Sequence, residues 1–256
     1  MYDVAEKVAL VTGGAAGIGY AIAEAFLQNH LKGVAIVDID EEAGVRAETS
    51  LSRKYSDRVI FIKTDVSERT QFDDAFKETV KKFKNLDIVV NCAGLLDEND
   101  WEREIAVNLT GTVNGTRLSF DEYLPKFMSG NEGVIINVSS TLALGWSSSV
   151  PIYIGTKIGV IGLSRSFGTE ANYERSKVKV IAVCPGYADT LIHKKYVNNF
   201  PSQFHLELFK KETSVETYQT ADHVAKCTIN IIKTGKNGSV WVIKNNTEGY
   251  EYKNVQ

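Results

Sequence analysis

The sequence predicts a single doubly wound α/β domain whose parallel sheet of about seven strands is flanked by helices. Short apolar, β-branched runs alternate with longer amphipathic runs along the whole chain. Some of the short runs, such as residues 88–90 and 134–136, contain no polar residue, which is typical of strands buried on both faces. No proline- or serine-rich linker and no internal repeat divides the 256 residues. One domain spanning residues 1–256 is therefore expected.

The first half of the chain alternates regularly between the two kinds of run. The strand-like runs end at polar residues, and the helical runs repeat apolar residues at intervals of three and four. Strands are expected over residues 7–12, 34–38, 59–64 and 86–91, and helices over residues 17–28, 41–54, 68–83 and 101–128.

The second half continues this alternation, but part of it is less regular. Strands are expected over residues 134–139, 178–184 and 240–244, and helices over residues 150–173 and 220–233. The irregular region, about residues 187–217, is expected to form a loop over the substrate. In open parallel sheets ligands bind beyond the carboxyl ends of the strands, so the functional residues are expected at those ends.

Composition and charge exclude several classes of partner. The net charge of −3 is spread without a basic tract, so nucleic acid is not an expected partner. No apolar run reaches the roughly twenty residues that span a bilayer, so no membrane insertion is expected. Three widely spaced cysteines indicate neither a disulfide framework nor a zinc site, and no metal is expected. The first residues lack the pattern of a secretion signal, and a cytoplasmic location is expected.

A glycine-rich turn joins the first expected strand to the first expected helix. Glycines there permit a tight turn and a close approach of the backbone to a pyrophosphate, whose charge then lies at the helix N-terminus. A lone glycine cluster is often only a turn, but this one has a strand before it and a helix after it. The sequence therefore predicts a Rossmann-type nucleotide site that includes Gly13, Gly17, Ile18 and Gly19.

Asp38 ends the second expected strand, nineteen residues after Gly19. A carboxylate at this point accepts hydrogen bonds from the adenosine ribose hydroxyls and repels a 2′-phosphate. No Arg or Lys follows it, since Ile39 and Asp40 come next, and the glycine turn supplies no cation. The expected cofactor is NAD rather than NADP, although Asp38 as a plain helix cap remains the alternative interpretation.

Two further strand ends are expected to form the floor of the same cleft. After the third strand a carboxylate is placed to meet the adenine amino group, and after the fourth strand small residues let a cofactor pass close to the backbone. Singly, each segment resembles an ordinary turn. Together they add five expected cofactor-binding residues: Asp65, Val66, Asn91, Ala93 and Gly94.

Tyr153 and Lys157 are four residues apart in one expected helix and share a face of it. A phenol has a pKa of about 10, too high for a base at neutral pH. An ammonium about 5 Å away, at an effective dielectric of about 20, favours the phenolate by roughly 3 kcal/mol. Ser140 ends a strand thirteen residues before Tyr153. The set predicts that Tyr153 is a general base, whereas the pair alone is also compatible with an aromatic beside a solvated lysine.

These residues, in this order, resemble the short-chain dehydrogenase/reductase family, and the resemblance covers nearly the whole chain. It implies that Tyr153 is the general acid/base, that Lys157 lowers its pKa and binds the nicotinamide ribose, and that Ser140 binds the substrate oxygen. It also implies that Asn108 holds a water that relays protons from Lys157. The remaining implied positions bind cofactor, with Asn91 at the adenosine ribose and Pro185, Gly186 and Thr190 at the carboxamide. Cys92 departs from the Asn usual in the family.

Three segments, residues 97–102, 133–137 and 159–162, look like the branch that contains 15-hydroxyprostaglandin dehydrogenases and insect-type alcohol dehydrogenases. The segment 238–243 lacks the Asp-Gly-Gly ending common elsewhere in the family. The prostaglandin enzymes have a glutamine three residues before the tyrosine, where this chain has Val150. Because Val150 cannot make that polar contact, prostaglandin itself is not the expected substrate.

The expected substrate pocket has mostly apolar walls around one reacting hydroxyl. Such walls favour a hydrophobic secondary alcohol or its ketone. In the segment 191–208, which is expected to contribute, His193 is the ionisable residue of interest, although a surface histidine on a lid is the simpler interpretation. The expected substrate-binding residues are Ser140, Leu142, Trp146, Val150, Tyr153 and Tyr187, with Leu95 and Leu144 nearby.

Two other functions are compatible with the same sequence features. An NADP-linked carbonyl reductase would use the same catalytic residues. A non-catalytic nucleotide-sensing protein would keep the fold without the chemistry, but the intact catalytic set argues against it. The resemblance also implies a homodimer or homotetramer, formed through the helices that begin near Trp101 and Val150. The segment 248–256 is expected either to cover a neighbour's pocket or to form a loose tail.

Overall fold

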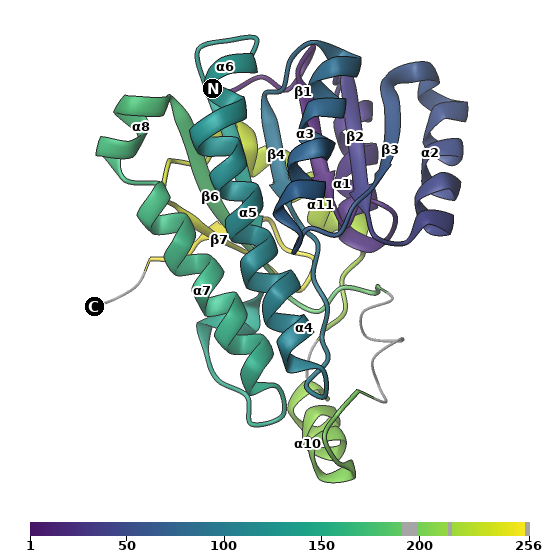
Figure 1. Ribbon diagram of the computed structural model, residues 1–256. Coiled ribbons are helices and arrows are strands. Elements are labelled where there is room, and N and C mark those ends of the chain that lie inside the picture. Colours follow the sequence, from purple (N-terminus) through teal and green to yellow (C-terminus); the bar gives the residue numbers. More distant parts are fainter. Residues whose placement is uncertain (191–198, 215–216, 254–256) are drawn as a thin grey trace.

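The computed structural model describes residues 1–190, 199–214 and 217–253 (Figure 1). Its strands form one sheet in the order β3-β2-β1-β4-β5-β6-β7-β8. Neighbouring strands up to β7 pair in parallel, and β8 pairs antiparallel with β7. The strands are β1 Val8–Thr12, β2 Gly33–Asp38, β3 Val59–Lys63, β4 Ile88–Asn91, β5 Gly133–Val138, β6 Val178–Pro185, β7 Val240–Ile243 and β8 Tyr250–Glu251. The predicted doubly wound sheet is confirmed, with β8 as a short added edge strand.

Helices cover both faces of the sheet, as the alternating pattern predicted (Figure 1). On one face α1, α2 and α11 pack around Phe26 and Leu51, and on the other α3 and the long helix after β4 pack around Phe72, Phe76 and Phe120. The helices are α1 Gly17–Gln28, α2 Glu41–Tyr55, α3 Arg69–Phe83, α4 Trp101–Ile105, α5 Thr112–Arg117, α6 Leu124–Phe127, α7 Pro151–Phe167, α8 Glu170–Ser176, α10 Gln203–Thr213 and α11 Ala221–Thr234. No helix in the described ranges combines the length and apolar character that crossing a bilayer requires.

The helix expected over residues 101–128 is one continuous run, but it is not uniformly α-helical. Two π-helical stretches, Ala106–Gly111 and Leu118–Tyr123, separate α4, α5 and α6. Pro125, which has no backbone N–H to donate, lies two residues after the second stretch. The first stretch contains Asn108, and wider turns of this kind often occur at functional sites.

Two expected elements differ from the structure. The helix expected over residues 150–173 is two helices: α7 ends at Phe167 and α8 begins at Glu170. Between them lies Gly168, where a Cβ would be 2.4 Å from the Gly238 Cα. The region expected to be irregular contains α10, which begins at Ser202, whose hydroxyl accepts from the His205 N–H. Helix α10 lies beyond the sheet, at the bottom of Figure 1. Residues 191–198, including His193, lie outside the described residues.

Candidate active site

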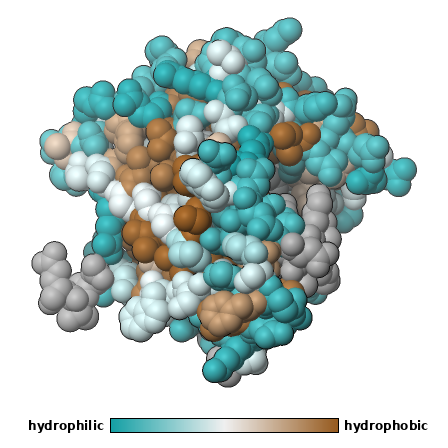
Figure 2. All heavy atoms as spheres, turned by 60° about the horizontal axis from the view of Figure 1, so that its bottom comes forward, coloured by the Kyte–Doolittle hydropathy of each residue, from teal (hydrophilic) through white to brown (hydrophobic). Residues whose placement is uncertain are grey.

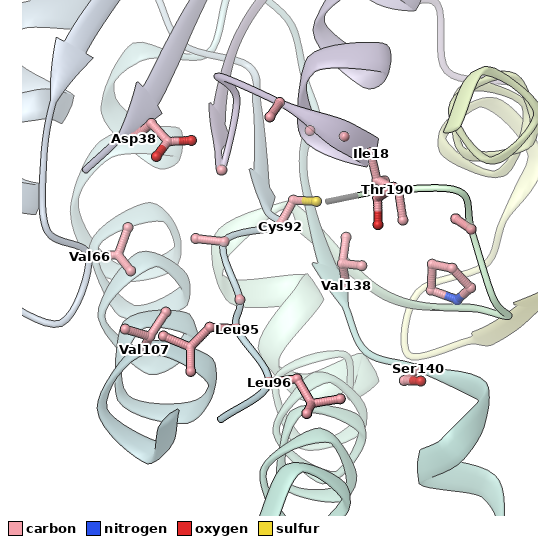
Figure 3. Close-up of a pocket in the computed structure, with 18 of the residues that line it drawn as sticks. Ile18, Asp38, Val66, Cys92, Leu95, Leu96, Val107, Val138, Ser140 and Thr190 are labelled. Atoms are coloured by element: carbon pink, nitrogen blue, oxygen red, sulfur yellow. The ribbon is translucent and has the colours of Figure 1, made fainter. Parts of the chain in front are cut away.

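A pocket of about 420 Å³ runs across the carboxyl ends of the central strands, where the topology predicted it. Asp38 lies at one end, Ser140 at the other, and Cys92 between them (Figure 3). Figure 2, which brings the bottom of Figure 1 forward, shows apolar residues gathered on this side of the molecule. Fourteen of the fifteen expected cofactor-binding residues line the pocket, namely Gly13, Gly17, Ile18, Gly19, Asp38, Asp65, Val66, Ala93, Gly94, Tyr153, Lys157, Pro185, Gly186 and Thr190.

The glycine turn brings backbone, rather than side chains, to the pocket. Gly13 has a positive φ of 64°, and a Cβ on it would lie 3.0 Å from the Ala93 Cα. A Cβ on Gly19 would lie 2.2 Å from the Gly13 carbonyl oxygen, so the first turn of α1 packs against the loop only because side chains are missing. This cradle has the shape that a pyrophosphate requires at a helix N-terminus.

Asp38 lines the pocket at the end of β2 and is held by two backbone donors. Its Oδ2 accepts from the Ala15 N–H at 3.1 Å and its Oδ1 from the Asp40 N–H at 3.2 Å. A cation that sequence reasoning missed, Arg46, also lines this end, although its guanidinium pairs with Glu42 at 3.6 Å. Arg46 lies on α2, six residues after Asp40, and only the packing of α2 brings it to the pocket.

Asp65 lines the pocket, but its carboxylate already has protein partners. Ser67 donates to Oδ1 from its backbone N–H and its hydroxyl, and Arg103 pairs with Oδ2 at 2.8 Å. Burial would raise the pKa of Asp65, but these hydrogen bonds and the charge of Arg103 lower it overall. The expected contact of Asp65 with an adenine amino group therefore competes with Arg103, which itself lines the pocket.

The end of β4 is tied to β1 by Thr12, and Asn91 is the one expected cofactor-binding residue that does not line the pocket. The Thr12 Oγ1 accepts from the backbone N–H groups of Cys92 and Ala93, both at 3.0 Å. Asn91 is 4% exposed and does not line the pocket. Its side-chain Nδ2 donates to the Asn137 Oδ1 at 2.8 Å, a buried contact between β4 and β5. The position of Asn91 in the strand was predicted, but its orientation was not.

Ser140, Tyr153 and Lys157 meet at the other end of the pocket. Ser140 lies beside Tyr153 in the pocket and lowers the pKa of the phenol, and the Lys157 Nζ lies 5.7 Å from the Tyr153 ring centroid. The Lys157 ammonium donates to the Val138 carbonyl at 3.1 Å, which holds it against the end of β5. The neighbouring Ser139 instead donates to the Lys157 carbonyl at 2.8 Å, so Ser140 is the serine that contacts Tyr153.

The acidity of Tyr153 differs from the expectation. Burial raises the pKa of Tyr153, and its hydrogen bond with Ser140 lowers that pKa only in part. Burial also lowers the pKa of Lys157. Removal from water therefore penalises the phenolate more than the protein's own polar contacts stabilise it, which opposes the expected effect of Lys157.

Asn108 lies behind the pocket and does not line it. It is fully buried, its side chain exchanges two hydrogen bonds of 2.8 Å with the backbone of Leu95, and its own carbonyl accepts from Thr112 at 2.8 Å. A Cβ on Gly94 would lie 3.2 Å from both the Asn108 Oδ1 and the Lys157 Nζ. Asn108 and Lys157 therefore face the same small space beside Gly94.

Four of the six expected substrate-binding residues line the pocket: Ser140, Leu142, Tyr153 and Tyr187. Trp146 does not, because it is 92% exposed on the loop before α7. Val150 does not either, because it is fully buried among Leu96, Ile154 and Phe200. Both residues are close to Tyr153 in the sequence, but in the structure Trp146 faces solvent and Val150 lies in the core.

Two apolar wall residues and one carboxylate were missed by sequence reasoning. Leu96 and Phe209 line the pocket, the second carried by α10. An amphipathic pattern over residues 204–209 was the signal for α10. Glu98 accepts from the backbone N–H groups of Ile152 and Tyr153 at 3.3 and 3.0 Å and so holds the first turn of α7. Within the described residues, no group of three His, Cys, Asp or Glu side chains is arranged to hold a metal.

Residues 7–200 match the family described as short chain dehydrogenase, and the chain therefore belongs to this family. It is 39% identical over 220 residues to human 15-hydroxyprostaglandin dehydrogenase (NAD(+)). The aligned region covers 85% of this chain and 77% of the relative. It is 27% identical over 249 residues to Alcohol dehydrogenase 1 of Ceratitis cosyra, covering 96% and 94% of the two chains. Both branches of the predicted resemblance are confirmed.

Solved structures agree on the fold. A short chain dehydrogenase/reductase from Burkholderia phymatum in complex with NAD superposes with a TM-score of 0.81 at 24% identity, covering 91% of this chain and 88% of that one. Levodione reductase superposes with a TM-score of 0.79 at 21% identity, covering 94% and 96%.

Proposed function

We propose that this chain is an NAD-dependent oxidoreductase that transfers a hydride between the cofactor and a secondary, hydrophobic alcohol or its ketone. The observation that carries the proposal is the meeting of Ser140, Tyr153 and Lys157 at one end of a pocket whose other end is bordered by Gly13 and Asp38. The 15-hydroxyprostaglandin dehydrogenases named for NAD(+) among the relatives support this choice of cofactor.

Ser140, Tyr153 and Lys157 have separate roles in the proposed oxidation of the alcohol. Ser140 orients the substrate oxygen, and the Tyr153 phenolate takes the hydroxyl proton as the ketone forms. Lys157, held on the Val138 carbonyl, keeps a positive charge beside the phenolate. NAD supplies the hydride acceptor and adds positive charge at this end when bound. Because burial raises the pKa of Tyr153, the proposal requires that these charges offset the cost of burial.

The choice of NAD over NADP rests on Asp38. A 2′-phosphate at the adenosine ribose would lie beside this carboxylate, which repels it. Arg46 could attract the phosphate, but its guanidinium is paired with Glu42 and is 69% exposed, so solvent screens it. Asp38, at the rim of the pocket and fixed by the Ala15 N–H, therefore dominates.

The proposed substrate is a hydrophobic alcohol because the walls near Ser140 are apolar. Leu95, Leu96, Leu142 and Phe209 line the pocket on this side. Val150 is fully buried and brings no polar group to the pocket, which favours an alcohol less polar than a prostaglandin.

The test is NADH formation, followed by absorbance, with purified protein and a panel of secondary alcohols that vary in chain length and polarity. We expect kcat/KM to rise with apolar length, by up to about fourfold for each added CH2 that is fully buried. Preference for charged or sugar-like alcohols would refute the substrate class, and a higher kcat/KM with NADP than with NAD would favour the carbonyl reductase. NADH binding without turnover of any alcohol or ketone would favour the sensor.

We also propose a cytoplasmic homodimer or homotetramer. Helix α7 carries an exposed Ile158, and Cβ atoms on Gly155 and Gly162 would meet nothing within 4 Å, so this face is flat enough for a second copy to approach. Three free thiols suit a reducing compartment. Light scattering of the protein and of Ile158→Asp tests the assembly, and an unchanged mass in the variant would exclude this face.

A further inference from the structure

Glu104 is a fully buried carboxyl group close to the catalytic residues, and the mechanism above does not use it. It lies on α4, one helical turn before Asn108, and is 0% exposed. Its Oε1 accepts from the Asn108 Nδ2 at a long 3.4 Å, and its Oε2 has no hydrogen-bond partner. None of the ion pairs formed by the described residues includes Glu104. A buried group with so few partners is costly for the fold, which calls for a functional reason.

Asn108 connects Glu104 to the catalytic helix. Besides Glu104, the Asn108 Nδ2 faces the Thr156 hydroxyl at 3.4 Å, and that hydroxyl donates to the Tyr153 carbonyl at 2.7 Å. The Asn108 Oδ1 faces the Lys157 Nζ across the space beside Gly94. Glu104 therefore lies behind the same amide that borders Lys157, and α4 packs directly against α7.

Several charged groups face Glu104 from its surroundings. Glu98 and Asp97 approach from the loop before α4, and Lys157 approaches from α7. Burial, followed by the charge of Glu98, raises the pKa of Glu104 to about 8, although the Asp97 backbone and Lys157 oppose the shift. Tyr153 also responds to this group, since the charge of an ionised Glu104 raises the pKa of the Tyr153 phenol.

We propose that Glu104 is a positioning residue of the reaction, a buried carboxylic acid that orients Asn108 and sets the charge beside Lys157 and Tyr153. The inference rests on the proposed function, because it concerns the same base. While Glu104 is protonated it adds no negative charge next to the phenolate. When it ionises above neutral pH it opposes loss of the Tyr153 proton. The alkaline part of the pH profile of alcohol oxidation is therefore governed by two coupled groups.

The test is the pH profile of kcat/KM for alcohol oxidation in Glu104→Gln, which keeps a side-chain oxygen for Asn108 but cannot ionise. We expect the rising limb assigned to Tyr153 to move toward lower pH by about one unit, so that the variant is about tenfold more active than the wild type on that limb. A purely structural role for Glu104 would lower activity at every pH instead. Glu102→Gln, an exposed neighbour on α4, is the matched control and should reproduce the wild-type profile.

Infrared spectroscopy gives a second measurement that needs neither cofactor nor turnover. The wild type should show a carboxylic-acid carbonyl band at about pH 6 that disappears by about pH 10, a range in which ordinary Asp and Glu side chains stay ionised. Glu104→Gln should lack this band and Glu102→Gln should keep it. If Glu104→Gln does not fold, Glu104→Asp, which withdraws the carboxyl from Asn108, should retain a band that titrates at a different pH.

The possible outcomes are distinct. A shifted limb together with a lost band supports the inference. An active wild type whose limb is unmoved in Glu104→Gln overturns it and leaves the proposed function standing, as does absence of the infrared band from the wild type. A wild type that forms no NADH with any alcohol overturns both.

Discussion

At the nucleotide end of the pocket most of the lining comes from backbone at strand ends, whereas at the substrate end it comes from side chains on separately folded segments. Gly13 and Gly19 bring the loop and α1 together without side chains, and Thr12 ties β4 to β1 through two backbone N–H groups. Such contacts depend on strand pairing in the buried sheet, so this end tolerates little change.

The substrate end is held by long-range side-chain contacts. Glu212 on α10 accepts from the hydroxyls of Ser147 and Ser149 and from the Ser148 N–H at 3.1 Å, which joins α10 to the loop before α7. Phe209 of the same helix packs on the cluster around Val150. Relatives in one family can therefore keep the cofactor and change the substrate, because the two ends are stabilised by different contacts.

The largest effect is expected from Tyr153, at the substrate end of the pocket. Tyr153→Phe removes the proton acceptor and should lower kcat roughly a thousandfold, which is in the range for loss of a general base. NADH affinity, followed by fluorescence titration, should stay within about threefold of the wild type, since the nucleotide end is untouched. Tyr173→Phe on α8, which removes a hydroxyl that donates to the Glu132 carboxylate, is the control. Retained turnover in Tyr153→Phe would remove Tyr153 from the mechanism.

The nucleotide end is tested by Gly19→Ala. The added Cβ would lie 2.2 Å from the Gly13 carbonyl oxygen, so the loop must move, at a cost of about 2 kcal/mol. We expect NADH affinity measured by calorimetry to fall by about thirtyfold. Gly162→Ala, where the added atom meets nothing within 4 Å, should leave affinity unchanged. Equal affinity in both variants would mean that the cradle does not hold the pyrophosphate.

At the nucleotide end, Asp38 and Arg46 are expected to have opposite effects on NADP binding, because Asp38 repels a 2′-phosphate and Arg46 attracts it. Asp38→Ala should move the ratio of kcat/KM values for NAD and NADP toward NADP by about tenfold, since it removes the charge that repels a 2′-phosphate. Adding Arg46→Ala to this variant should cancel most of the gain. A gain that persists in the double variant would assign the phosphate contact to another residue.

The smallest effect is expected from Glu212→Gln at the substrate end, which weakens the half-buried contacts between α10 and the loop before α7 without changing a catalytic residue. KM for the alcohol should rise by about threefold while kcat changes little. Glu207→Gln, exposed on the same helix, should behave like the wild type. A fall in kcat equal to the rise in KM would instead place Glu212 in the catalytic step.

The contacts of Glu212 with the loop before α7 also predict that the stability of α10 depends on pH. Burial would raise the pKa of Glu212, but the hydrogen bonds from Ser147, Ser149 and the loop backbone lower it overall. A carboxyl with a lowered pKa stabilises the folded state above its ordinary pKa of about 4 and loses that contribution as the pH falls further. Proteolysis of α10 should therefore increase below about pH 4 in the wild type and change less with pH in Glu212→Gln.

The sequence predicted the alternation of strands and helices, the glycine turn, the position of Asp38 and the spacing of Tyr153 and Lys157. Each depends on short-range rules: burial on both faces of a strand, the absence of a Cβ in a tight turn, and the four-residue repeat that places two side chains on one helix face. The family resemblance added the order in which these signals follow one another.

Only the tertiary structure decided which side chains reach the pocket. Asn91 turns toward Asn137, Val150 enters the core and Trp146 faces solvent, although all three lie at the expected places in the chain. Arg46 and Phe209 reach the pocket from α2 and α10, elements whose placement depends on packing with distant segments. Burial likewise opposes the expected lowering of the Tyr153 pKa. Orientation and desolvation depend on neighbours far along the chain, whereas the local pattern of residues reports only the secondary structure that carries each side chain.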